Sequence, residues 1–89
     1  MALHCLYRSD AATLAGLREC LSPGDAVLLL GAAVCTSPAQ LRLEGATIFA
    51  LAEDAAAHGR TFQNEDVCCI DYPAWVELST EHRLQQVWA

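Results

Sequence analysis

Apolar residues gather in short runs separated by turn residues along this chain. One run, Ala26 to Leu30, follows the turn signal Pro23-Gly24 and is closed by Gly31. A continuous apolar run between turn residues is typical of a strand buried on both faces, although periodicity alone fits a buried helix as well. The run is too short to offset the cost of nucleating a helix. We interpret it as a central parallel strand with helices covering both sides.

Other apolar segments rich in strand-forming residues lie on either side of this run. Strands are predicted at Ala2–Tyr7, Ala46–Leu51 and Val67–Ile70, and a short strand at 86–88 is a further option. Helix signals fill the intervals between them. The first helix is predicted from Ala11 to Leu21, with Ser9 or Asp10 as its cap, and the second after Ser37-Pro38 as far as Gly45. The third is predicted from Glu53-Asp54 to His58-Gly59. The fourth is predicted from Tyr72 to about His82, with Asp71 as its cap.

The resulting order is strand, helix, strand, helix, repeated along the chain. Such alternation predicts a parallel sheet with right-handed crossovers and helices on both faces. We therefore predict a small α/β fold, with residues 1–89 as a single domain built on a mostly parallel sheet of four to five strands.

The composition suggests a partner. With 89 residues the chain can build only a small core, yet 54% of its residues are hydrophobic. Apolar surface covered by a partner subunit would explain this excess. The alternative is that many alanines inflate the apolar count without adding much core.

The charge balance excludes several partners. The net charge is −6, and the five basic residues are all arginine and scattered along the chain. Phosphate binding needs clustered cations, so we expect no direct contact with nucleic acid and no adhesion to anionic membranes. The apolar runs are too short to span a bilayer, and the first residues do not have the basic and long apolar regions of a signal peptide. These features predict a cytoplasmic protein.

Two cysteines flank the central strand and are the candidate reactive groups. Cys35 follows the strand and precedes a predicted helix N-terminus, where the helix dipole stabilises a thiolate. Cys20 lies near the end of the first predicted helix, where the dipole disfavours a thiolate. For each, an unreactive loop or helix cysteine is the alternative interpretation.

The remaining candidates for chemistry favour structural roles. Cys5, Cys68 and Cys69 lie in predicted strands and are expected to be buried there. His4 is expected to be a strand histidine with satisfied hydrogen bonds, and His58 and His82 are expected to face solvent. Their spacings match no metal motif, and nucleotide-binding glycine motifs are absent from the sequence, so we predict no metal and no cofactor.

Five segments form a distinctive pattern in order along nearly the whole chain: Leu3-His4 with Arg8-Ser9, LRECLSPGDAVLLL at 17–30, IFALAEDAAAHG at 48–59, IDYPAWVELST at 70–80, and the final QQVWA. This pattern resembles the DsrH/TusB family of intracellular sulfur-relay subunits. Trp75 replaces the family's more usual Phe. The segment 31–45 is shorter than the family's loop, and Gly31-Ala32 stands where an Asp-Gly or Asn-Gly pair is common.

The resemblance implies a function. Subunits of this kind assemble with sister subunits of the TusC/DsrF and TusD/DsrE types as a heterohexamer that carries persulfide sulfur. In one branch the sulfur reaches 2-thiouridine at the wobble position of tRNA, and in another the complex serves dissimilatory sulfur oxidation. The principal acceptor cysteine belongs to the TusD/DsrE-type sister. Cys20 falls where the DsrH branch carries a cysteine, whereas Cys35 has no family counterpart.

Three hypotheses follow from these observations. The first is a sulfur-carrier subunit of a sulfurtransferase complex, supporting tRNA 2-thiolation, with Cys20 as candidate carrier and Cys35 as the weaker one. The second is a non-catalytic architectural subunit of the same complex. The third is a free-standing homodimer of the same fold.

Overall fold

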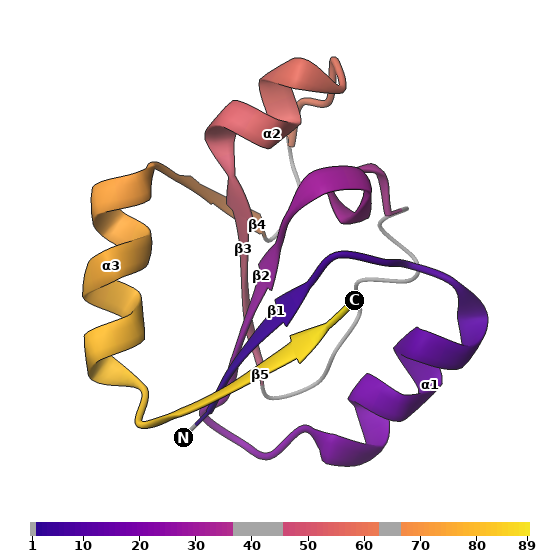
Figure 1. Cartoon of the computed structure of the whole chain (residues 1–89), viewed down its shortest axis with the longest axis vertical. Helices are drawn as coiled ribbons and strands as arrows, with labels where there is room; N and C mark the ends of the chain where they lie inside the picture. The colour runs from indigo at the N-terminus through magenta and orange to yellow at the C-terminus, as the bar shows by residue number, and fades with distance from the viewer. Residues whose placement is uncertain (1, 37–45, 63–66) are drawn as a thin grey trace.

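The computed structural model describes residues 2–36, 46–62 and 67–89. In this part of the chain, five parallel strands form one sheet with helices on its faces, which confirms the predicted fold class (Figure 1). The strands are β1 (Ala2–Leu6), β2 (Ala26–Leu29), β3 (Thr47–Leu51), β4 (Val67–Ile70) and β5 (Leu84–Trp88). Their order across the sheet is β4-β3-β2-β1-β5, so the apolar run is the middle strand, as predicted.

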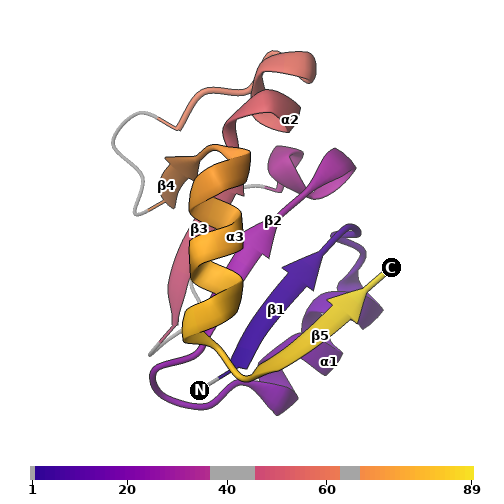
Figure 2. The same cartoon turned by 60° about the vertical axis from the view of Figure 1, so that its left-hand side comes forward.

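Three α-helices and one 3₁₀ turn connect these strands in the described residues. They are α1 (Ala11–Cys20), η1 (Gly31–Cys35), α2 (Ala52–Ala57) and α3 (Tyr72–Glu81). Helices α1 and α3 lie on opposite faces of the sheet, and α2 lies beyond the carboxyl ends of the strands (Figures 1 and 2). Among the residues described, no helix is long and apolar enough to cross a membrane.

Aspartates begin the two longer helices. The Asp10 carboxylate accepts a hydrogen bond from the Thr13 N–H at 3.1 Å, and Asp71 accepts one from the Ala74 N–H at 3.0 Å. Each bond satisfies a backbone donor that has no partner within its helix. The predicted caps at Asp10 and Asp71 are therefore confirmed.

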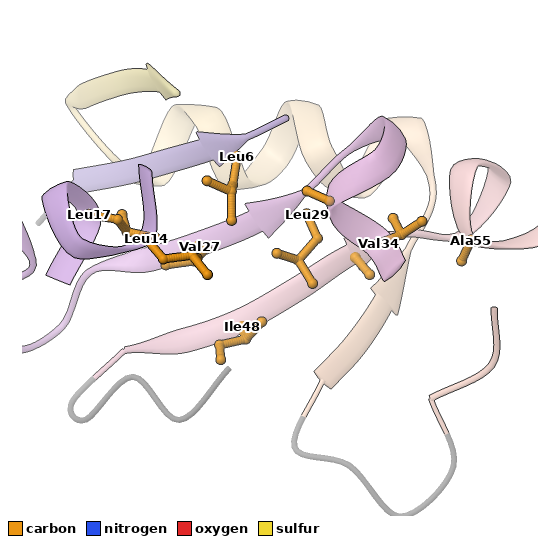
Figure 3. Packing of buried hydrophobic residues seen from close by; sticks show 10 residues of the cluster. Leu6, Leu14, Leu17, Val27, Leu29, Val34, Ile48 and Ala55 are labelled. Atoms are coloured by element: carbon orange, nitrogen blue, oxygen red, sulfur yellow. The ribbon is translucent and has the colours of Figure 1, made fainter. Parts of the chain in front are cut away.

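Alternating side chains of the sheet build a core on each face. Val27 and Leu29 of β2 face the α1 side, where they pack with Leu6, Leu14 and Leu17 (Figure 3). The other face packs against α3 and contains the following side chains: Leu3, Cys5, Ala26, Leu28, Leu30, Leu51 and Leu78. All five residues from Ala26 to Leu30 are buried, as the run predicted.

Two elements differ from the sequence-based expectation. The small residues after β2 form the 3₁₀ turn η1, an element that was not predicted from the sequence. β5 begins at Leu84 and is longer than the predicted strand at 86–88, because it pairs with β1 along its whole length, from Ala2↔Leu84 to Leu6↔Trp88. The helix predicted after Ser37-Pro38 lies outside the described residues.

Candidate functional site

Cys20 is an exposed thiol at the end of a well-anchored helix. It is the last residue of α1, whose inner face buries Leu14 and Leu17. The helix runs back from the carboxyl end of β1 to the amino end of β2 (Figure 1). Cys20 is therefore held at the amino edge of the sheet, on a rigid element and open to solvent.

Cys35 is also exposed, but it lies at the other edge of the sheet. It is the last residue of η1, directly beyond the carboxyl end of β2. The guanidinium of Arg60 donates to the carbonyl oxygens of Val34 at 3.3 Å and Thr36 at 3.4 Å, the residues on either side of Cys35. Arg60 thus ties the Cys35 backbone to the segment after α2. The helix start invoked for Cys35 falls outside the described residues.

The fold keeps the two candidate thiols apart. In a strand-helix-strand unit of parallel strands, the helix ends at the opposite edge from the loop that follows the second strand. Cys20 and Cys35 occupy these two positions. They therefore belong to separate surfaces and form no dithiol pair.

The other three cysteines divide into one buried and two exposed. Cys5 is buried in β1 as predicted, and burial raises the pKa of its thiol. The prediction that Cys68 and Cys69 are buried was wrong, since both are exposed. They lie on β4, which is an edge strand, so neighbouring side chains cover it from one side only.

The carboxyl edge of the sheet brings together polar and aromatic residues that follow the strands. The Asp54 carboxylate accepts a hydrogen bond of 2.8 Å from the Gly31 N–H, joining α2 to the end of β2. The negative charge of Glu53, followed by burial and by the charges of Asp54 and Tyr7, raises the pKa of Tyr72. These groups share one acidic, aromatic edge. Ligands of open α/β sheets bind at such an edge.

A buried polar cluster lies on the α1 side of the sheet. His4 and Asp25 are 1% and 4% exposed, and His4 Nε2 lies 3.1 Å from Asp25 Oδ2. The Trp88 indole Nε1–H donates to His4 Nδ1 at 3.2 Å. His4 is thus the satisfied strand histidine that was predicted. Asp25 was not singled out from the sequence, although a carboxylate directly before a fully buried strand is a usable signal.

The other two histidines differ from each other. His58 is exposed, as predicted. His82 was expected to face solvent but is 6% exposed, because its Nδ1–H donates to the Leu78 carbonyl at 2.9 Å and folds the ring back onto α3. Across residues 2–36, 46–62 and 67–89, no three His, Cys, Asp or Glu side chains come together in a way that could hold a metal ion.

The fold defines a small α/β protein with exposed thiols, and its described residues contain no metal-binding cluster. Comparison with known proteins identifies its family. The family model of DsrH-like proteins matches residues 8–85. The chain therefore belongs to the DsrH-like family, and its function at the family level is that of a sulfur-relay subunit. Members of this family normally work with sister subunits. A search of curated proteins found no match.

Proposed function

We propose that this chain is a subunit of an intracellular persulfide-relay complex that supports 2-thiolation of the wobble uridine in tRNA. The family match over residues 8–85, which include the exposed Cys20, supports the sulfur-relay part of this proposal. A relay cysteine must meet its donor and acceptor at the surface, which a buried thiol such as Cys5 cannot do.

Cys20 is the proposed carrier. Its thiolate attacks the outer sulfur of a donor persulfide, the donor S–S bond breaks, and the donor leaves as a thiolate with the bonding electron pair. Cys20 then holds the transferred sulfur as its own persulfide, with no net oxidation or reduction. A second attack by an acceptor thiolate moves the sulfur onward. The exposure of Cys20 supports this role, and Cys35 is the second, weaker candidate.

Sister subunits of the TusC/DsrF and TusD/DsrE types are the proposed partners, in a heterohexamer. Exposed apolar side chains support a covered surface on α3 and β5: Val76 is 63% and Val87 62% exposed. The net charge of −6 supports docking on a more basic partner, and it fits a subunit that does not itself grip tRNA.

The carrier role is tested by loading variants that keep one exposed thiol, beside the buried Cys5, with a persulfide donor. One variant replaces Cys35, Cys68 and Cys69 by serine and keeps Cys20. Its matched control keeps Cys35 and replaces Cys20, Cys68 and Cys69. Intact mass should show a gain of one sulfur, about 32 Da, on the first variant, removed by a reductant. A sulfur adduct on the control alone would assign the carrier role to Cys35. If neither variant gained sulfur, the carrier role would be ruled out and the architectural role would be supported.

Whether the subunit serves tRNA 2-thiolation or dissimilatory sulfur oxidation is tested in the organism that carries the gene. Deleting the gene should lower 2-thiouridine in tRNA nucleosides analysed by mass spectrometry, and the wild-type gene should restore it. Unchanged 2-thiouridine together with lost sulfur oxidation would instead support a DsrH-type subunit of a dissimilatory sulfur-oxidation relay.

The architectural and homodimeric alternatives rest on the same exposed apolar side chains of α3 and β5. Purification of the chain at its native level separates them. Co-purification with two homologous small subunits supports the complex, and a stable dimer of this chain alone supports the homodimer.

A further inference from the structure

The hydrogen bonds around His4 determine where its proton lies. An indole Nε1–H can only donate, so the 3.2 Å contact with Trp88 requires an unprotonated Nδ1 on His4. The proton of the neutral ring is then on Nε2, which donates to Asp25 Oδ2 at 3.1 Å. His4 in this structure is therefore neutral, with an acceptor facing β5 and a donor facing Asp25.

Asp25 is an ionised partner that does not depend on β5. It accepts hydrogen bonds from the Ala2 N–H at 2.9 Å and the Ser22 N–H at 3.0 Å. Burial acts to raise the pKa of Asp25, but these bonds and the one from His4 outweigh it and hold that pKa below its usual value. A second proton on His4 would strengthen the pairing with this carboxylate, because both groups would then be charged.

β5 has one side-chain anchor in the core. Leu84, Gln85, Gln86 and Val87 are exposed, and Trp88 alone in this strand is partly buried, against the core on the α1 side. The indole ring lies so close to α1 that a Cβ on Gly16 would be 3.1 Å from it. The rest of β5 is held by its backbone pairing with β1 and by the Gln85 side-chain amide, which donates to the Ser79 carbonyl of α3 at 3.3 Å.

We propose that protonation of His4 releases the C-terminal strand β5 from β1. In this sense His4 is a pH-dependent latch for β5. Neutral His4 accepts the Trp88 indole hydrogen and holds β5 against β1. When Nδ1 binds a proton, two N–H donors face each other, the bond to Trp88 is lost, and the indole leaves its place. Protonation at the same time reinforces the pair of His4 with Asp25, so β1 to β4 stay folded while β5 loosens.

Few charged groups surround His4 in the part of the chain that the structure describes. The charged group facing it is Asp25, before β2. The residues of β5 are uncharged, and the charged residues of α1, Arg18 and Glu19, are exposed. Cys5 of β1 belongs to the core on the opposite face.

His82 is the second buried histidine, and it directly precedes the connection to β5. Its ring is bonded to Leu78 of α3 and not to Trp88. Acid could act on β5 through either histidine, so the test needs a variant of each. The latch concerns the folding of this chain alone and is independent of sulfur transfer.

The test follows β5 by NMR in the Trp75→Phe protein, where the one indole N–H signal belongs to Trp88. Hydrogen exchange is measured between pH 8 and pH 5 and corrected for the intrinsic effect of pH. Protection of the β5 amides and the Trp88 indole should fall at least about tenfold relative to the β2 amides. An equal fall in β2 and β5 would overturn the latch.

Matched variants assign the effect to the His4–Trp88 bond. Trp88→Phe keeps a ring but no donor, so β5 protection should be lower at pH 8 and no longer vary with pH. His4→Gln cannot titrate and should also remove the pH dependence, which keeps the test decisive if Trp88→Phe fails to fold. His82→Gln should retain it. A pH dependence that survives both Trp88→Phe and His4→Gln, or is lost in His82→Gln, contradicts the proposal.

Discussion

The indole of Trp88 donates a hydrogen bond of 3.2 Å to the ring of His4, which lies 84 positions earlier in the chain. The backbone of the same residue completes the connection, since the Tyr7 N–H donates to the Trp88 carbonyl at 2.9 Å. Through these contacts the last strand is fixed to the first. Asp25 extends this cluster to the start of β2, so the buried polar cluster connects three neighbouring strands, β5, β1 and β2.

Asp25→Ala should be among the most destabilising single substitutions in the chain. Removing the carboxylate leaves the N–H groups of Ala2 and Ser22 and the Nε2–H of His4 without their acceptor. Leaving a buried donor without its acceptor costs about 1–3 kcal/mol of unfolding free energy for each group. The measurement is urea denaturation followed by circular dichroism at pH 7.

Asp71→Ala is the matched control for this substitution. Asp71 is also an aspartate that accepts a backbone hydrogen bond, but it is exposed. Loss of such a helix cap costs about 1 kcal/mol. Equal losses of unfolding free energy in the two variants would mean that Asp25 acts as a simple turn residue.

The lowered pKa of Asp25 predicts acid sensitivity. A carboxylate with a lowered pKa in the folded state stabilises the fold above about pH 4, its ordinary pKa in an unfolded chain. That stability is lost as the pH falls through the lower pKa of the folded state. Asp25→Asn cannot ionise, so its unfolding free energy should be lower at pH 6 and should fall less in acid.

A second carboxylate serves as the control for acid unfolding. Hydrogen bonds from the Thr13 side chain and N–H lower the pKa of Asp10, but Asp10 is exposed. Asp10→Asn should therefore change the acid slope of the unfolding free energy less than Asp25→Asn. The reverse order would show that the exposed cap dominates the acid response.

Gly16 predicts a measurable coupling between α1 and β5. Alanine in the middle of a helix is favoured over glycine by about 1 kcal/mol. At this position the new methyl group would lie 3.1 Å from the Trp88 ring and would push the indole away from His4. Gly16→Ala should therefore raise the unfolding free energy only slightly in the wild type. It should raise it by the full amount, about 1 kcal/mol, when Trp88→Ala is also present. Equal gains in both backgrounds would contradict this contact.

Much of the fold could be predicted from the sequence because its signals are local. The apolar run at Ala26 to Leu30, the caps Asp10 and Asp71, and the glycine after His58 each act within a few residues. Hydropathy could not reveal which strands form the edges, so Cys68 and Cys69 were assigned to the core. The partners of His4 were equally hidden, because the contact with Trp88 depends on β5 returning beside β1.

The placement of the five cysteines predicts their order of reaction with an alkylating reagent. Cys20, Cys35, Cys68 and Cys69 are exposed, and Cys5 is 4% exposed in the core behind α3. Burial also raises the pKa of the Cys5 thiol, so little thiolate is present near neutral pH.

Native protein treated with iodoacetamide at pH 7.5 should therefore gain four adducts quickly, with the fifth appearing only as the chain unfolds. Peptide mapping by mass spectrometry assigns the slow site, and its rate should follow the population of unfolded protein as urea is added. Cys5→Ser is the matched control, because it should remove the slow phase and leave the fast one unchanged. Fast labelling of Cys5 in the native protein would mean that the sheet opens on the α3 side. The thiols that react quickly are then those that a persulfide donor can reach. Comparison of the alkylation rates of Cys20 and Cys35 shows which of the two is more accessible.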